Sequence, residues 1–296
     1  MSLLDSLMPL LQDPPPSMVF ELSEAGVAVA RLGPKTELDF RPLKAGVLSL
    51  SPLKDNVVMP DELSMAVREM APRNGKNKRR DVALILPDYS VRVAVLDFDT
   101  FPSDPKEQIA LIRFRVRKSV PFDVEAAAIS YCAQPGEGKK FDVVVVMAPL
   151  EVISRYEAPF RAAGLNPGLV TTSALAALNL VEAGGITVVA KVTGGVLTVM
   201  VLEHGRLKLV RCLEVHANDI AEIGADLYPT FVYVEDNFGA KAERLLLCGF
   251  GERMETARSQ FHGDLGVEVE PVHSPLMTPG ENEAGLLGYL KSVGRN

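Results

Sequence analysis

The chain has 296 residues, of which 47% are hydrophobic and 23% charged, and this length favours two domains or two pseudo-repeated lobes over one compact core. Its net charge of −7 argues against nucleic-acid binding. The three cysteines form no CxxC pair and the four histidines lack ligand spacing, so we expect buried free thiols and neither disulfides nor a metal site. No uninterrupted apolar run reaches the length of a transmembrane helix.

Residues 1–17 are predicted to form an N-terminal tail. The segment lacks the basic start and cleavage site of a signal peptide. Its leucines fall roughly on one helical face, and three prolines then end the segment. Two interpretations stay open, a packed terminal turn and a short anchor for a partner or a membrane surface.

Strand-like and helix-like patterns alternate along the first half. Residues 19–32 (`VFELSEAGVAVARL`) predict a hairpin that turns at residues 24–26. The apolar run 81–86 is typical of a buried strand. Residues 105–119 begin with proline and end in basic residues, as suits the dipole of a helix. Further strands are expected at 44–49, 91–97, 126–133 and 141–149, and helices at 61–70 and 150–163.

The second half repeats this alternation. An extended piece and an apolar helix are expected after residue 164, followed by a second hairpin at 187–212 that turns at 203–205. A helical stretch at 216–238 is expected to break at Pro229. Strands are then expected at 244–250 and 267–272, and helices at 252–260 and 283–291. The alternation predicts an α/β protein with mixed sheets.

Four passages carry a family resemblance. They are `LILPDYSVRVAVLDFDTFP`, `IRFRVRKSVPFDVEAAAISY`, `VVVVMAPLEVISRYEAPFRAAGLNPGLVTTSALAALNL` and the second hairpin with `HGRLKLVR`, which together span about residues 82–211. In order and spacing they resemble the PilM family of type IV pilus machines, which is related to FtsA.

The resemblance implies an actin-like (ribonuclease H-like, duplicated) two-lobed fold with an FtsA/PilM-type inserted subdomain. The first lobe would span residues 18–186, with the insertion at about 89–169, and the second lobe residues 187–296. The last 50 residues match the family only in outline.

The resemblance also implies a function. The chain would be a cytoplasmic scaffold at the inner membrane, where it binds the N-terminal tail of a PilN-like membrane protein in a groove beside the inserted subdomain and meets other pilus platform proteins. Three alternatives stay open: an active or nucleotide-gated ATPase or kinase of the superfamily, the cytoplasmic domain of a GspL-like type II secretion protein, and an unrelated two-lobed α/β binding protein.

In this superfamily, three glycine-bearing turns surround ATP and Mg²⁺. The first Asp-x-Gly is here replaced by Glu21-Leu22-Ser23. The second is replaced by Lys191-Val192-Thr193, which Gly194 and Gly195 follow. The third turn reads Gly249-Phe250-Gly251, where Phe250 would stack on adenine or fill an empty pocket.

Lys191 removes a carboxylate that would face Mg²⁺, although its ammonium could contact a phosphate directly. We therefore expect a degenerate nucleotide site, with no catalytic residue, no metal site and no required cofactor. Weak binding of ATP with Mg²⁺ is the alternative.

Other charged features have a structural and a functional interpretation. Asp97 and Asp99 lie two residues apart on a predicted strand, so both could face one side. They are interpreted either as solvated charges at the sheet edge or as a carboxylate pair for acid–base chemistry. Arg113, Arg115, Arg117 and Lys118 form a basic helix face, and `RNGKNKRR` at 73–80 forms a basic run. Both basic features are interpreted either as solvated surface or as contacts to a partner or anionic lipid.

Overall fold

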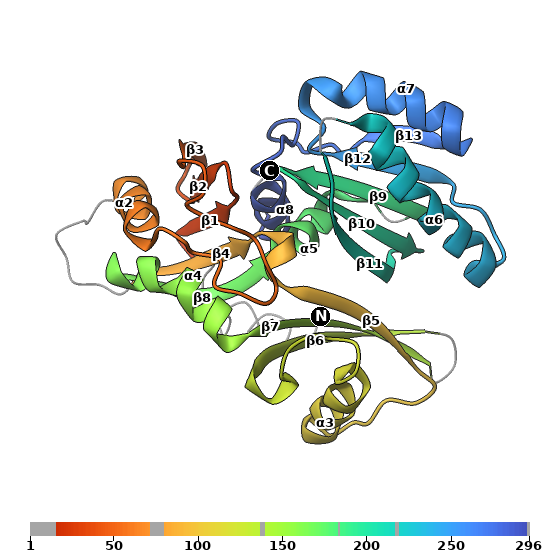
Figure 1. Cartoon of the computed structure of the whole chain (residues 1–296), viewed down its shortest axis with the longest axis horizontal. Helices are drawn as coiled ribbons and strands as arrows, with labels where there is room; N and C mark the ends of the chain where they lie inside the picture. Colours follow the sequence, from red (N-terminus) through yellow and green to blue (C-terminus); the bar gives the residue numbers. More distant parts are fainter. Residues whose placement is uncertain (1–15, 72–79, 137–139, 183, 217–218, 295–296) are drawn as a thin grey trace, which may run out of the picture.

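The computed structural model describes residues 16–71, 80–136, 140–182, 184–216 and 219–294. These residues form two five-stranded sheets and one three-stranded sheet (Figure 1). The tail features predicted at 1–15 and the basic run up to residue 79 lie outside the described residues. Within the described ranges, no helix has the length and apolar character needed to span a membrane.

The first sheet has the strand order β3-β2-β1-β4-β8. Strands β1 to β3 form an antiparallel meander, whereas β1, β4 and β8 run parallel. Helices α2 and α4 cover one face, where Phe20 and Phe160 pack edge to face. The elements are β1 (Met18–Leu22), β2 (Gly26–Arg31), β3 (Glu37–Pro42), α2 (Pro60–Met70), β4 (Arg80–Leu86), α4 (Leu150–Ala162) and β8 (Leu165–Thr172).

The second sheet repeats this arrangement in the order β11-β10-β9-β12-β13. Strands β9 to β11 are antiparallel, and β9, β12 and β13 are parallel. Helices α6 and α7 cover its outer face through residues such as Leu227 and Phe261. The elements are β9 (Ile186–Thr193), β10 (Val196–Glu203), β11 (Arg206–Glu214), α6 (Ile220–Phe238), β12 (Arg244–Cys248), α7 (Met254–Leu265) and β13 (Glu268–Pro271).

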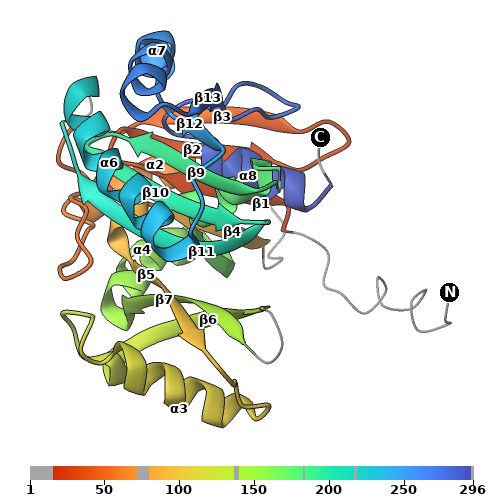
Figure 2. The ribbon, with the colours of Figure 1, turned by 90° about the vertical axis from the view of Figure 1, so that its right-hand side faces the viewer.

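The third sheet is inserted between β4 and β8 and has the antiparallel order β5-β7-β6. Helix α3 covers one face of it, where Ile112 and Val116 pack against Val143 and Val145. Figure 2 shows this sheet and α3 as a separate layer at one end of the molecule. The elements are β5 (Arg92–Phe98), α3 (Pro105–Val116), β6 (Ala127–Pro135) and β7 (Phe141–Pro149).

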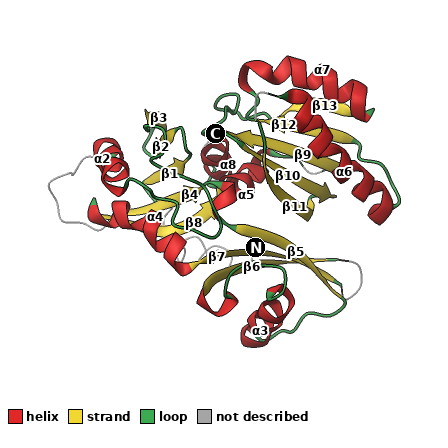
Figure 3. Ribbon diagram, in the orientation of Figure 1, coloured by secondary structure: helices red, strands yellow, loops and turns green. Residues whose placement is uncertain are grey.

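Helices α5 (Ser173–Ala177) and α8 (Ala284–Ser292) form a layer between the two five-stranded sheets (Figure 3). Leu286 of α8 packs toward the first sheet, and Leu287 toward the second. The two helices can approach closely because Gly288 has no side chain; a Cβ atom there would collide with the Ala176 carbonyl. Short 3₁₀ turns complete the described structure at Asp88–Ser90, Val124–Ala126, Leu178–Leu180 and Gly251–Arg253.

The strand predictions need two corrections. The third strand lies at Glu37–Pro42 and not at 44–49, where Leu48 makes only an isolated bridge to Val57. Every residue of β3 is exposed, so the strand carries no apolar run that would mark it. The segment 187–212 was predicted as one hairpin, but it forms most of a three-stranded meander with a first turn at Gly194 and Gly195.

Two further expectations were wrong. Helix α6 continues through Pro229, which lies with Ala225 on the exposed side of the helix, where the loss of one helix hydrogen bond costs less than in the core. Cys132 is exposed on β6, whereas Cys248 is buried and all three cysteines are free. The lobe bounds 18–186 and 187–296, with the insertion at 89–169, stay predictions. Helix α8, although it lies near the end of the chain, packs against both lobes.

Candidate functional site: an interlobe cluster and an apolar groove

The alternation of strand residues turns two predicted site residues toward the α5/α8 layer. Along β1, Val19 packs toward α8 and Phe20 toward the opposite face, so Glu21 faces the layer. Along β9, Val189 packs toward the same layer, and Lys191 follows two residues later. Both charged side chains are almost fully buried, with exposed fractions of 2% for Glu21 and 1% for Lys191.

Lys191 forms a buried ion pair with Asp88 that joins the two lobes. Its Nζ lies 2.9 Å from Oδ2 of Asp88 and donates a second hydrogen bond to Thr193 Oγ1 at 2.7 Å. Thr198 Oγ1 also donates to Asp88 Oδ2, at 3.2 Å. The other carboxylate oxygen of Asp88 accepts from the backbone N–H of Ala174 at 2.6 Å. The ion pair is therefore hydrogen-bonded to both lobes and to the start of α5.

Glu21 accepts hydrogen bonds from the first turn of α8. The backbone N–H of Leu286 donates to Oε2 at 2.6 Å, and that of Gly285 to Oε1 at 3.3 Å. The Ser173 hydroxyl also donates to Oε1. These helix N–H groups have no partner within the helix, and the helix dipole favours an acceptor there. We name this set the interlobe cluster: Glu21, Asp88, Ser173, Lys191, Thr193 and Thr198.

Burial and the ion pair set the charges in the cluster. Burial raises the pKa of Glu21 to about 7, although Lys191 and the hydrogen bonds oppose this shift. Burial would lower the pKa of Lys191, but Asp88 and Glu21 outweigh it and the pKa is raised. Lys191 is thus charged at neutral pH and is balanced by Asp88. Burial also raises the pKa of the neighbouring Cys248 to about 12, which keeps its thiol neutral.

The turn at Gly194 and Gly195 connects β9 to β10 and approaches the first hairpin. A side chain at Gly194 would begin 3.6 Å from the Glu24 carboxylate. Burial raises the pKa of Glu24, and the nearby charge of Glu214 adds to the shift. The second glycine turn therefore faces acidic side chains. Ser23 closes the first turn, where its hydroxyl and the Gly26 backbone share hydrogen bonds of 3.2 Å.

The third turn belongs to the core of the second lobe. Gly249 has a φ of +78°, and a side chain there would collide with the Val192 carbonyl. Phe250 is fully buried and packs edge to face on Phe261, with the ring centroids 6.1 Å apart. Of the two roles considered for Phe250, this position matches filling space. Gly251 begins the short 3₁₀ turn before α7.

The structure brings together three predicted residues, Glu21, Lys191 and Thr193, and leaves the others at turns around the cluster. Sequence reasoning missed Asp88, Ser173 and Thr198. Asp88 had a usable signal, because an acidic residue directly after a buried strand and a proline lies at the strand's carboxyl end. Ser173 and Thr198 carried no such sequence signal, since hydroxyl residues are common in helices and strands.

The other charged candidates lie on the surface. The Asp97 carboxylate is 94% exposed and pairs with Arg115 at 3.3 Å. It lies with Asp99 at the rim of a polar cavity of about 550 Å³ between the inserted sheet and the β10–β11 turn. Across the described ranges, no group of three or more His, Cys, Asp or Glu side chains is placed to hold a metal ion.

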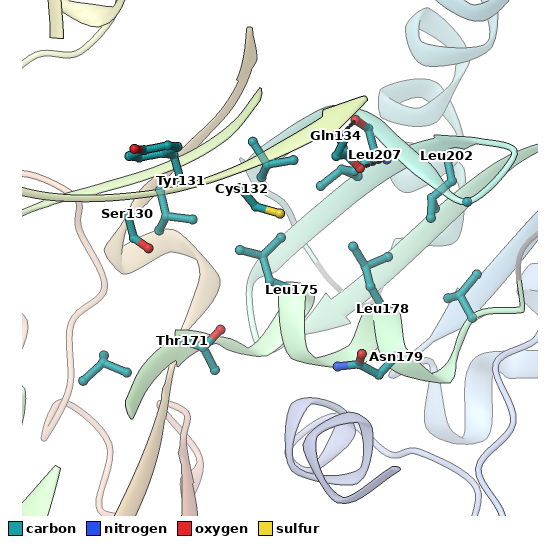
Figure 4. A pocket seen from close by; sticks show the side chains of 15 residues that line it. Ser130, Tyr131, Cys132, Gln134, Thr171, Leu175, Leu178, Asn179, Leu202 and Leu207 are labelled. Atoms are coloured by element: carbon teal, nitrogen blue, oxygen red, sulfur yellow. Dashed lines mark hydrogen bonds between the residues drawn. The ribbon is translucent and has the colours of Figure 1, made fainter. Parts of the chain in front are cut away.

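An apolar groove lies between the inserted sheet, the α5 segment and the second lobe (Figure 4). Its cavity measures about 490 Å³; Leu175 points from α5 toward Cys132 on β6, and Leu178 points from the following 3₁₀ turn toward Leu207. None of the lining side chains is charged. We name it the β6 groove; its lining residues are Ser130, Tyr131, Cys132, Gln134, Val144, Val146, Val170, Thr171, Leu175, Leu178, Asn179, Val181, Leu202, Gly205 and Leu207.

The β6 groove and the interlobe cluster share a wall. A smaller cavity of about 190 Å³ is lined by Asp88 and Thr198 of the cluster and also by Leu175, which lines the groove. The N–H of Ala174, next to Leu175, is bonded to Asp88. The ion pair thereby fixes the helix that forms one side of the groove.

Comparison with solved structures shows an actin-like fold. A chain of the PilM–PilN type IV pilus biogenesis complex has a TM-score of 0.77 at 18% identity, over 94% of this chain and 98% of that chain. A Bacteroides thetaiotaomicron protein with an actin-like ATPase fold and unknown function has a TM-score of 0.55 at 13% identity, over 91% and 94%. The predicted two-lobed fold and its likeness to PilM are confirmed.

Other comparisons add little. The cytoplasmic domain of Vibrio cholerae EpsL, an inner membrane component of the type II secretion system, has a TM-score of only 0.49 at 13% identity, over 78% of this chain and 80% of that chain. No family model and no curated protein matches the sequence.

We predict that Lys191→Met destabilises the protein strongly. The substitution leaves Asp88 charged and buried without its partner, which should cost about 3–5 kcal/mol in urea unfolding. The double variant Lys191→Met with Asp88→Asn should lose less stability than Lys191→Met alone, because the buried charge of Asp88 is removed as well. Lys44→Met breaks an exposed ion pair to Glu62 and should cost no more than about 1 kcal/mol. Equal losses for the two lysine variants would contradict a structural ion pair.

We predict that Glu21 makes stability fall as pH rises. The folded-state pKa of Glu21, about 7, lies above its ordinary value of 4.5, so the folded state binds the proton more tightly than the unfolded state. Stability should therefore decline between these two pH values, by about 2–3 kcal/mol, and level off above pH 7. The decline should be smaller by that amount in Glu21→Gln. Urea unfolding of both proteins across this pH range measures the decline. If stability changes with pH in parallel for the parent protein and Glu21→Gln, the assignment to Glu21 is wrong.

Proposed function

We propose that this chain is a non-catalytic, actin-like scaffold in the inner-membrane assembly platform of a type IV pilus or a related secretion machine. It binds the N-terminal tail of a PilN-like membrane protein and presents that protein to other components on the cytoplasmic side. The observation that carries the proposal is the likeness of fold, over nearly the whole of both chains, to a chain of the PilM–PilN complex.

The β6 groove supports the tail-binding part of the proposal. Its uncharged, mostly apolar lining suits an extended peptide with a few apolar anchors. Strand β6 is an edge strand, so a peptide could also pair with its outer backbone groups. Thr171 and Asn179 offer polar groups at the opposite wall (Figure 4). These features give the tail a site beside the inserted sheet.

The interlobe cluster supports a degenerate nucleotide site. Mg²⁺ prefers oxygen ligands, commonly carboxylates, whereas β9 offers the ammonium of Lys191, already paired with Asp88. The acidic Glu24 beside the Gly194 turn would repel a phosphate. These residues do not fit Mg-ATP, and an internal ion pair joins the lobes without a nucleotide. An active ATPase would need a different set of side chains here.

In this role the protein lies at the cytoplasmic face of the inner membrane, where its membrane partner holds it. The role involves no nucleic acid and no cofactor. The acidic net charge of −7 suits this role, since it disfavours binding to nucleic acids.

We predict that a peptide copying the N-terminal tail of a PilN-like protein binds in the β6 groove. Cys132→Trp places a large ring in the groove from an exposed position, and it should weaken the peptide affinity about tenfold or more in calorimetric titration. Leu169→Trp is the matched control, because Leu169 is exposed on β8 but does not line the groove. Equal affinities for both variants would exclude this groove as the tail site.

We predict that the protein does not bind ATP, with or without Mg²⁺, at concentrations up to about 1 mM. The physical reason is the ion pair of Lys191 with Asp88 at the position where the second turn would face the metal. Calorimetric titration of the full chain provides the measurement. Micromolar, Mg²⁺-dependent binding would overturn the degenerate site and favour a nucleotide-gated switch.

A further inference from the structure

The outer face of α3 presents an unusual combination of side chains. Phe114 is 74% exposed, more than any other exposed large hydrophobic residue in the described chain. On a helical projection it lies within about 80° of Lys106, and Arg117 at the helix C-cap and Lys118 in the turn that follows are also exposed. We name this set, together with Ala110, the α3 face.

The α3 face is basic although the whole chain is acidic. The α3 face holds three basic residues, Lys106, Arg117 and Lys118, and no acidic residue, whereas the net charge of the chain is −7. Of these three, Arg117 pairs with Glu125 at 3.3 Å. Lys106 and Lys118 form no ion pair with any residue that the structure describes.

The inner side of α3 packs against the inserted sheet, so only its outer side is open to a partner. Ile112 and Val116 are buried against the inserted sheet, so the exposed Phe114 has no role in that core. Figures 1 and 2 both place α3 at an outer end of the molecule, away from the two larger sheets. The protruding ring of Phe114 can enter a deformable lipid surface.

We propose that the α3 face docks on a membrane surface rich in anionic lipid. The cations would lie among the headgroup phosphates, and the Phe114 ring would enter the boundary between headgroups and acyl chains. Charge complementarity identifies the occupant, because an acidic protein approaches an anionic bilayer favourably only through a locally basic face.

This docking also suits the proposed tail site, although it does not depend on it. In the inserted sheet, Ile129 and Ala133 of β6 pack on the side of α3, whereas Ser130 and Cys132 face the β6 groove. The groove and the α3 face therefore lie on opposite sides of one sheet. A tail that emerges from the membrane at α3 needs only to pass around this sheet to enter the groove.

The test is sedimentation of the full chain with vesicles of phosphatidylcholine, with and without phosphatidylglycerol. We expect binding only with phosphatidylglycerol, and weaker binding when salt rises to about 0.5 M. Lys106→Glu combined with Lys118→Glu should weaken binding about tenfold or more. Phe114→Ser should weaken it about fivefold, through loss of the inserted ring.

Matched controls separate the α3 face from general surface charge. Lys35→Glu with Lys54→Glu makes the same change in net charge at exposed sites of the first lobe, and Met65→Ser removes another exposed apolar side chain. Both control variants should bind anionic vesicles with an affinity within about twofold of that of the parent protein. Equal losses in the controls, or no sedimentation of the parent protein with anionic vesicles, would overturn the proposal. The second result would leave an acidic protein surface as the alternative occupant. Peptide titration of the β6 groove would be unaffected in either case, so it tests the proposed function separately.

Discussion

The ion pair between Lys191 and Asp88 is the interaction on which the arrangement of the lobes depends. A buried charge is costly unless it is paired and hydrogen-bonded, so each partner requires the other within about 3 Å. Because Asp88 follows a strand of the first sheet and Lys191 lies on a strand of the second, this requirement fixes the two sheets relative to each other. Their spacing is then filled by α5 and α8.

The helix layer extends this constraint to the surface. Helices α5 and α8 direct their first N–H groups at Asp88 and Glu21, so their positions follow from those of the carboxylates. Helix α5 and the 3₁₀ turn after it supply Leu175 and Leu178 to the β6 groove. The proposed scaffold role calls for a groove of constant shape, and the hydrogen bond from Ala174 to Asp88 holds the helix on one side of this groove.

The inserted subdomain is a thin element with two different surfaces. Strand alternation gives the sheet one face for α3 and another for the groove, so a single sheet can serve two contacts. In the proposed assembly, one surface holds a peptide and the other meets lipid. Each contact on its own is small, but two linked contacts strengthen each other because the second occurs at high effective concentration.

The sequence by itself determined most strands and helices and the altered glycine turns, because apolar periodicity and turn residues are local signals. Its length and its resemblance to a known family gave the two-lobed fold. It also marked Glu21 and Lys191, although not their partners. It missed β3, whose residues are all exposed, and the passage of α6 through Pro229. Only the tertiary structure decided that Lys191 meets Asp88, 103 residues away, and that α8 returns to Glu21. Such contacts depend on how sheets and helices pack, and no local pattern encodes that distance.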